Sequence, residues 1–179
     1  MALKLDFNKA YDRIQWDFLQ VVMLKMGFHG NWVNLVMECV TTVSFSIYIN
    51  GAKSTSINPS CGLCQGDPLS PYLFLMVGDV FSSLITWALY SQGISGLKMR
   101  RTCPVISHIF FADDAILFLR ANQNEWQHIL ATLHLYSASG QLINFDKSRV
   151  VFSSNASVLT QSSICSSLGV PQANLQAKY

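Results

Sequence analysis

Short apolar segments in three parts of the chain have the length and composition of β-strands. Ala2–Asp6 is the first of them, and Val105–Leu119 contains two more, separated by a pair of adjacent acidic residues. Leu142–Phe152 is also strand-like, although a polar segment interrupts it. Because two strands joined by a tight turn pair with each other, Val105–Leu119 is predicted to form a β-hairpin.

A second hairpin is predicted between residues 44 and 58. Ser44–Asn50 alternates apolar and polar residues, the Asn50-Gly51 pair is a strong turn signal, and Lys53–Asn58 follows as the partner strand. The alternation predicts that three side chains of the first strand face inward, namely Phe45, Ile47 and Ile49.

Helical segments lie between the strands. Apolar residues at helical spacing predict a helix over Gln15–Met26, with one apolar face formed by Leu19, Val22, Met23 and Met26. Further helices are predicted from an Asn31 cap through Thr42, over Ser70–Tyr90, from an Asn122 cap to near Gly140, and in a short segment before Gly169. Ser70 and Pro71 have the residue types of a cap and a first helical residue, and residues 59–68 form a loop.

A few strands separated by long helices are typical of an α+β fold. We therefore expect a small antiparallel sheet with helices packed mainly on one face. With 179 residues the chain is long enough for one domain with a hydrophobic core, and it contains no internal repeat or linker.

Asp113 and Asp114 interrupt an otherwise apolar stretch, where ionised carboxylates are costly unless they are paired, hydrated or metal-bound. An acidic hairpin turn is the simpler interpretation, but tight hairpins favour Asn-Gly or Asp-Gly, and this turn has no glycine. Asp6, at the end of the first strand, could add a third carboxylate. Such a cluster can hold two divalent cations about 3.5–4 Å apart, as in phosphoryl transfer, and Mg²⁺ suits all-oxygen ligands.

Two other patterns are weaker. Four residues match ligand positions of a calcium-binding EF-hand loop, namely Asp6, Asn8, Asp12 and Asp17, but Ala10 and Tyr11 stand where that loop needs an oxygen ligand and a glycine. Cys61 and Cys64 have the spacing of zinc ligands, but a structural zinc site needs four ligands and the other cysteines are scattered.

The composition favours a chain that has partners. Half of the residues are hydrophobic and 12% are charged, against about 25% charged in an average soluble domain, so part of the surface is expected to be covered by further protein or nucleic acid. The net charge of +2 is low for a nucleic-acid-binding domain. Five cysteines and no signal peptide predict an intracellular setting of unknown compartment. No uninterrupted apolar run approaches the roughly 18 residues that span a bilayer, so no membrane partner is expected.

Four sequence blocks carry a further pattern. They are Lys4-Leu5-Asp6 with Lys9-Ala10-Tyr11-Asp12-Arg13 and Trp16, then Gly62 to Phe74 including Gln65-Gly66-Asp67-Pro68-Leu69-Ser70-Pro71, then Phe111-Ala112-Asp113-Asp114, and a weaker block from Ser139 to Phe145 with Lys147-Ser148. In this order and spacing they resemble the reverse transcriptases of non-LTR (LINE-type) retrotransposons, most closely those of plants. The resemblance covers nearly the whole chain, and the second block is the most specific.

The resemblance implies roles for individual residues. Asp6, Asp113 and Asp114 match the metal-holding catalytic acids, with Asp114 the third of them, near the primer end. Lys147 matches a lysine that protonates the pyrophosphate leaving group. Taken without the resemblance, Lys147 would be interpreted as a solvated surface lysine.

Four more residues match positions that bind nucleotide or template, namely Phe7, Tyr11, Gln65 and Gly66. Tyr11 matches an aromatic gate that excludes a ribose 2′-hydroxyl by its bulk, and Gln65-Gly66 matches a loop that touches the incoming nucleotide and the template. Without the resemblance, Tyr11 would be a core tyrosine and Gln65-Gly66 an ordinary turn.

The fold that the resemblance implies is a polymerase palm. It also implies an RNA-directed DNA polymerase that uses two Mg²⁺ ions, or Mn²⁺, with an RNA template, a DNA primer and deoxynucleoside triphosphates as partners. Residues 1–179 are expected to be a partial domain, truncated at both ends, because relatives continue upstream into fingers and beyond Lys178-Tyr179 into a thumb. Without those parts the isolated chain is expected to be inactive or nearly so.

One departure and two alternatives accompany this interpretation. Cys64 stands where the family usually has an arginine, which removes a positive charge from a place where nucleic acid is expected. The chain could also be a decayed retroelement relic without activity. A cysteine-based metal-binding or scaffold module is the third hypothesis, and the lack of a complete Cys/His ligand set opposes it.

Overall fold

The structure of the chain, a computed structural model, describes residues 1–173; the predicted chain end at Lys178-Tyr179 lies outside them. Two compact units are distinguished. The sheet unit comprises Met1–Asn8, Phe81–Ser137 and the chain from Gln141, and the helix-pair unit comprises Lys9–Val80 with Ala138–Gly140.

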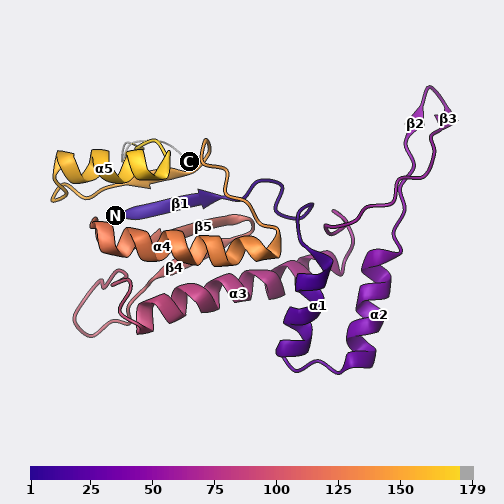
Figure 1. Cartoon of the computed structure of the whole chain (residues 1–179), viewed down its shortest axis with the longest axis horizontal. Coiled ribbons are helices and arrows are strands. Elements are labelled where there is room, and N and C mark those ends of the chain that lie inside the picture. The colour runs from indigo at the N-terminus through magenta and orange to yellow at the C-terminus, as the bar shows by residue number, and fades with distance from the viewer. Residues whose placement is uncertain (174–179) are drawn as a thin grey trace. The chain divides into compact units, whose positions relative to one another are not determined.

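The sheet unit contains a four-stranded antiparallel sheet in the order β4-β5-β1-β6 (Figure 1). The strands are β1 (Ala2–Asp6), β4 (His108–Phe111), β5 (Asp114–Phe118) and β6 (Arg149–Val151). The N-terminal strand therefore lies between the acidic hairpin and β6. The predicted strand at the start of the chain, the acidic hairpin and the α+β class are confirmed.

Helices cover one face of this sheet. The strand residues that face them are at most 1% exposed, namely Leu3, Leu5, Ala115, Leu117 and Val150. Phe81 of α3 (Ser70–Tyr90) stacks on Phe110 of β4 at 5.4 Å between ring centroids, and on Tyr136 of α4 (Gln123–Tyr136) at 4.5 Å. Because side chains alternate along a strand, Asp6 and Asp114 belong to the opposite, open face.

His108 lies on the covered face of β4, where its ring nitrogens meet two serine hydroxyls. Its Nε2 is 2.8 Å from Ser82 Oγ of α3 and its Nδ1 is 2.9 Å from Ser107 Oγ. Burial lowers the pKa of His108 below the ordinary value of 6.5, because the charged imidazolium loses hydration in this position.

We expect the chain to lose stability as the pH falls below the ordinary histidine pKa of 6.5. As the pH falls, the unfolded chain takes up a proton on His108 before the folded chain does. The contribution of neutral His108 to the free energy of unfolding is therefore complete above pH 6.5 and is lost as the pH falls through the lower pKa of the folded state. Urea unfolding measured across this range should show the decline. The His108→Gln variant should lose less stability on acidification, whereas His134→Gln, at an exposed position of α4, should decline like the unaltered chain. Equal pH profiles for His108→Gln and the unaltered chain would contradict the role of His108.

The helix-pair unit contains α1 (Trp16–Lys25) and α2 (Gly30–Thr41), which lie side by side in Figure 1, and the hairpin of β2 (Tyr48–Ile49) and β3 (Ala52–Lys53). The turn at Asn50-Gly51 is confirmed, with positive φ of 50° and 83° as a primed hairpin turn requires. The prediction that three of its side chains face inward is wrong. Exposed fractions are 44%, 55% and 62% for Phe45, Ile47 and Ile49, because a hairpin that no second layer covers has no inner face.

Several boundaries differ from those predicted. His29, not Asn31, is the N-cap of α2, and its Nδ1 accepts a hydrogen bond from the Asn31 amide at 3.3 Å. The helix after Asn122 ends at Tyr136 and continues as a 3₁₀ turn over Ser137–Ser139. The strand-like segment 142–152 forms regular pairing over Arg149–Val151 alone. The short helix before Gly169 is confirmed as α5 (Val158–Leu168).

Helix α3 matches its predicted range of Ser70–Tyr90 and is long and apolar enough to cross a membrane by length and composition. That is weak evidence, since core helices of soluble proteins pass the same test. Its stripe of Leu73, Val77, Phe81 and Ile85 is buried within the protein, as expected of a helix that packs one face against neighbouring elements. The absence of a membrane partner stays a prediction.

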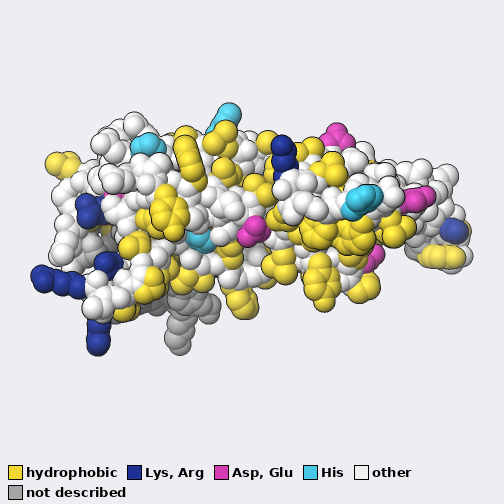
Figure 2. Space-filling view, turned by 90° about the horizontal axis from the view of Figure 1, so that it is seen from below, with side chains coloured by type: hydrophobic (Ala, Val, Ile, Leu, Met, Phe, Trp, Pro, Cys, Tyr) yellow, Lys and Arg dark blue, Asp and Glu magenta, His cyan; other side chains and the backbone are white. Residues whose placement is uncertain are grey.

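Large apolar side chains are frequent on the surface. Figure 2 shows hydrophobic side chains over much of one face and few charged ones. Tyr90 and Phe111 are 82% exposed and Trp87 is 65% exposed. Exposed large apolar side chains in this number are more than a surface facing water alone requires, which is consistent with the prediction of a covering partner.

Candidate active site

The three predicted acids lie together at one end of the sheet unit. Asp6 and Asp114 are direct register partners on the antiparallel strands β1 and β5, and Asp113 precedes Asp114 in the turn between β4 and β5. Directly opposed residues of an antiparallel pair have Cβ atoms roughly 4.5–5.5 Å apart. Asp113 is exposed, whereas Asp6 and Asp114 are half-buried. The backbone therefore brings the N-terminal acid to the acidic pair, although more than 100 residues separate them in the sequence.

The turn that carries Asp113 is tight and has no glycine. Phe111 and Asp114 are paired, so Ala112 and Asp113 alone make the turn, and Ala112 has a φ of 52°. A residue with a Cβ in this left-handed region costs on the order of 1–2 kcal/mol. Such strain persists where the surrounding structure imposes it, and it is frequent at functional sites.

Lys4 adds a positive charge to the same face. It lies two residues before Asp6 on β1, and its Nζ is 2.8 Å from Oδ2 of Asp114. Each of the two side chains is 36% exposed. A carboxylate oxygen of the acidic set is thus already engaged by an ammonium group.

The three carboxylates fit Mg²⁺ or Mn²⁺ by donor type, because both ions prefer hard oxygen ligands, and by backbone register. Their side chains, however, are not gathered into a cage. Within residues 1–173, no group of three or more His, Cys, Asp or Glu side chains is arranged to hold a metal ion. The backbone register thus brings the three acids close to one another, but Asp114 is paired with Lys4 and the three side chains do not form a complete ligand sphere.

A turn over Asn144–Ser148 holds the backbone of Asp6. The Asp6 amide donates to Ser148 Oγ at 3.2 Å, and the Asp6 carbonyl accepts from the Asn144 amide at 2.8 Å. Ser148 is fully buried and also donates to the Asn144 carbonyl at 2.8 Å. Lys147 belongs to this turn and its side chain is exposed, so the predicted proton donor is carried by the segment that fixes Asp6.

The two predicted aromatic residues have different surroundings. Phe7 packs edge-on against Phe81 and Tyr136, with ring centroids 5.7 and 5.8 Å apart, so its ring is engaged in the core of the sheet unit. In the helix-pair unit, the half-buried Tyr11 lies flat on Phe74, at 4.5 Å with 9° between the ring planes. Stacking restrains the Tyr11 ring, as a steric gate would require. The nucleotide-binding role of both residues stays a prediction.

The loop that carries Gln65 and Gly66 is fastened to the segment after Tyr11. The amides of Gly62 and Leu63 donate to the carbonyls of Ile14 and Tyr11 at 2.8 and 2.9 Å. Trp16 Nε1 donates to the Gly62 carbonyl at 2.8 Å. Gly62 has a φ of 89°, and a Cβ there would lie 2.6 Å from the Asp12 carbonyl oxygen, so no other residue fits without displacement.

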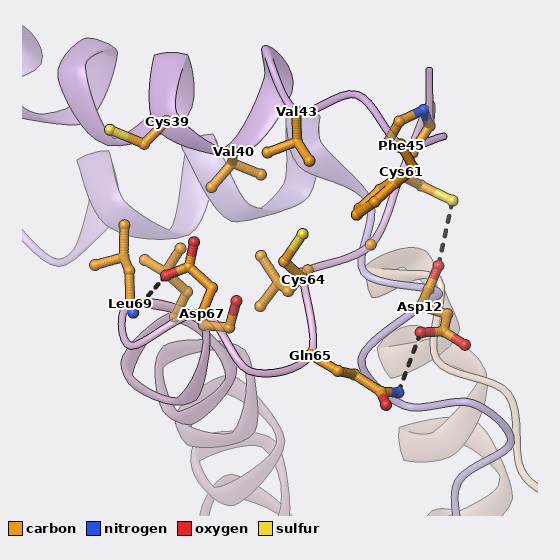
Figure 3. A pocket seen from close by; sticks show the side chains of 15 residues that line it. Asp12, Cys39, Val40, Val43, Phe45, Cys61, Cys64, Gln65, Asp67 and Leu69 are labelled. Carbon is orange, nitrogen blue, oxygen red and sulfur yellow. Dashed lines mark hydrogen bonds between the residues drawn. The ribbon is translucent and has the colours of Figure 1, made fainter. Parts of the chain in front are cut away.

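A cavity of about 550 Å³ borders this loop in the helix-pair unit (Figure 3). Gln65 Nε2 donates to Asp12 Oδ1 at 3.4 Å, and both side chains line the cavity. Cys39, Cys61 and Cys64 line it as well, and Cys61 Sγ donates to the Asp12 carbonyl at 3.5 Å while the Cys64 sulfur points elsewhere. This arrangement gives the Cys61/Cys64 pair no metal-binding geometry among the described residues.

In each of the two units, the structure adds partners of the predicted residues that the sequence did not single out. Lys4, Ser148, Phe74 and Asp12 were not assigned roles, yet they pair with Asp114, Asp6, Tyr11 and Gln65. All four stand in the motif blocks, but a neighbour could be predicted for Lys4 alone, since strand alternation places it on the same face as Asp6. The other pairings join segments that are distant in the sequence.

The fold has a clear counterpart among solved structures. Telomerase from Candida tropicalis, without its C-terminal domain, superposes with a TM-score of 0.62 at 14% sequence identity. The match covers 82% of this chain and 29% of the telomerase chain. A second structure of that telomerase, in complex with a fragment of telomeric RNA, matches with the same TM-score at 12% identity. The chain therefore shares its fold with part of the telomerase chain.

Residues 1–172 match the family described as "Reverse transcriptase (RNA-dependent DNA polymerase)". The chain belongs to the reverse transcriptase family, and the resemblance found in its sequence motifs is confirmed.

Its relatives include retrotransposon polyproteins. The Pol polyprotein of a type-1 retrotransposable element R2 from Popillia japonica is 27% identical over 82% of this chain, which corresponds to 23% of that polyprotein. A type-2 R2 element of Drosophila melanogaster is 27% identical over 80% of this chain and 13% of its own length. An uncharacterized mitochondrial protein of Arabidopsis thaliana is 46% identical over 66 residues, 37% of this chain and 54% of that protein. The chain thus spans about half or less of the curated relatives that it matches.

Proposed function

We propose that this chain is the palm of an RNA-directed DNA polymerase of a non-LTR retrotransposon, which performs nucleotidyl transfer with two divalent cations. The observation that carries the proposal is the direct pairing of Asp6 with Asp114, next to the Ala112-Asp113 turn. Asp6, Asp113 and Asp114 would hold Mg²⁺ or Mn²⁺. When bound in such a site, these ions activate an attacking hydroxyl and offset charge on the leaving oxygen.

The remaining residues act on the substrates. Lys147, exposed on the turn that holds the Asp6 backbone, donates a proton to the departing pyrophosphate or offsets its charge. Tyr11, restrained by Phe74, acts as the steric gate against a ribose 2′-hydroxyl. Gln65 and Gly66, in a loop fastened by Trp16 and by backbone hydrogen bonds, contact nucleotide and template.

The partners that follow are an RNA template, a DNA primer and deoxynucleoside triphosphates. Phosphoryl transfer depends mainly on positioning and on electrostatic stabilisation of the transition state. We propose that segments outside this chain, the fingers and the thumb of a longer polyprotein, supply the positioning of triphosphate and duplex. The exposed apolar surface and the small share of the relatives' length that the chain spans support this proposal.

The isolated chain is therefore expected to synthesise little or no DNA. The test is primer extension on poly(rA)/oligo(dT) with Mg²⁺ and, separately, Mn²⁺, with a complete reverse transcriptase as the positive control. Processive synthesis that disappears in an Asp113→Asn variant would overturn the expected inactivity and support the catalytic assignment. A decayed relic would also be inactive, and both descriptions can hold for one chain. Coding sequence for fingers and thumb beside this reading frame, interrupted by stop codons, would mark a relic.

A further inference from the structure

We propose that Lys4 is a built-in counter-ion of the acidic site. Its ammonium group pairs with the Asp114 carboxylate until a divalent cation binds there and displaces it. The inference rests on the proposed function, since it concerns how the same three carboxylates receive their ions. It assigns a role to a residue that stands outside the acidic set itself.

The placement of Lys4 follows from strand register. Asp6 is opposite Asp114 and Lys4 is opposite Ile116, so Lys4 is a diagonal neighbour of Asp114 on the open face. Its Nζ reaches Asp114 Oδ2 at 2.8 Å. Two carboxylates directly opposite each other on neighbouring strands repel, and a cation beside them reduces that repulsion. Lys4 supplies this cation from within the chain.

The same contact opposes metal binding. An ammonium group that donates to a carboxylate oxygen uses the lone pair that a divalent cation would need, and its charge repels that cation. Because both partners are about one-third exposed and lysine has a long flexible stem, the pair is weak enough to be displaced reversibly.

The neighbouring arginine does not take this role. Arg149 is opposite Lys4 in register on β6, but its guanidinium donates to the backbone carbonyls of Asp146 and Ser148. Of these two basic residues, Lys4 is therefore the one whose side chain contacts an acid of the site, namely Asp114.

The test is the affinity of the purified chain for Mn²⁺, measured from the free-ion signal in electron paramagnetic resonance. Lys4→Gln is expected to raise this affinity about threefold to fivefold, the size expected for losing one half-exposed ion pair. Lys4→Arg, which keeps the charge, should bind no more tightly than the unaltered chain. Lys53→Gln, at an exposed lysine of β3, is the matched control and should leave the affinity unchanged.

Thermal stability gives a second readout that does not depend on activity. In metal-free buffer Lys4→Gln should have a lower Tm than the unaltered chain, because the carboxylates lose their counter-ion. Saturating Mn²⁺ should remove this difference, since the ion replaces the missing charge.

Failure of this inference differs from failure of the proposed function. If Asp113→Asn weakens Mn²⁺ binding but Lys4→Gln binds as the unaltered chain does or more weakly, the role of Lys4 is overturned and the acidic site stands. If Mn²⁺ binding is the same in the unaltered chain and in Asp6→Asn and Asp113→Asn, both are overturned.

Discussion

Replacement of Asp113 by asparagine is expected to lower the Mn²⁺ affinity of the chain by at least about tenfold, since outer-shell changes at metal sites already cost 10–100-fold. The substitution keeps the size of the side chain and removes one of the three carboxylate charges. In a longer protein that contains this chain together with its proposed fingers and thumb, it should abolish DNA synthesis. Asp17→Asn, which removes an exposed carboxylate from the first turn of α1, is the matched control and should bind Mn²⁺ like the unaltered chain.

Stability separates a catalytic role of Asp113 from a structural one. Asp113 is exposed and lies beside a second carboxylate in a strained turn, so its neutralisation should leave the Tm in EDTA unchanged or raise it slightly, by relieving repulsion. A marked drop in Tm in EDTA would show instead that Asp113 stabilises the turn, and the catalytic assignment would then lose its support.

Gly140→Ala is expected to cost about 3 kcal/mol or more of the free energy of unfolding, or to prevent folding of the helix-pair unit. Gly140 has a φ of 87°, and a Cβ at this position would lie 2.0 Å from the Arg13 carbonyl oxygen. The adjacent Ser139 carbonyl accepts from the Gln15 amide at 3.0 Å, so the segment cannot move away without losing that bond. Both the backbone conformation and the close approach require glycine.

Urea unfolding at neutral pH measures this effect. Gly78→Ala is the matched control, because Gly78 lies inside α3, has no atom within 4 Å of an added Cβ, and should gain up to about 1 kcal/mol from helix propensity. If Gly140→Ala is as stable as the unaltered chain, the segments around Arg13 and Gly140 do not pack as described.

Local patterns were sufficient for most secondary structure. The apolar period located α1, α3, α4 and the strands β1, β4 and β5 within a few residues, because a strand or helix must place its apolar side chains on one face. The pattern failed at β2 and β3, where alternation predicted an inner face that no element within residues 1–173 covers. Alternation reports how side chains are divided between two faces, and it does not say whether either face is covered.

Gly140 shows the same limit for single residues. Its position after a predicted helix suggested a helix end, yet α4 ends at Tyr136 and the requirement for glycine comes from the approach of the Arg13 backbone. Sequence spacing cannot reveal such a contact, since the two segments are far apart along the chain.

By itself, the sequence determined the family and the α+β class, and it predicted the three acids, because motif order and apolar period can be read along the chain without knowledge of its contacts. The tertiary structure decided that Asp6 faces Asp114, that Lys4 engages Asp114 and that Ser148 holds the Asp6 backbone. These pairings depend on the register between β1 and β5 and on the turn after Gln141. Register is set by packing of the covered face and by backbone hydrogen bonds between distant strands, which no local pattern contains.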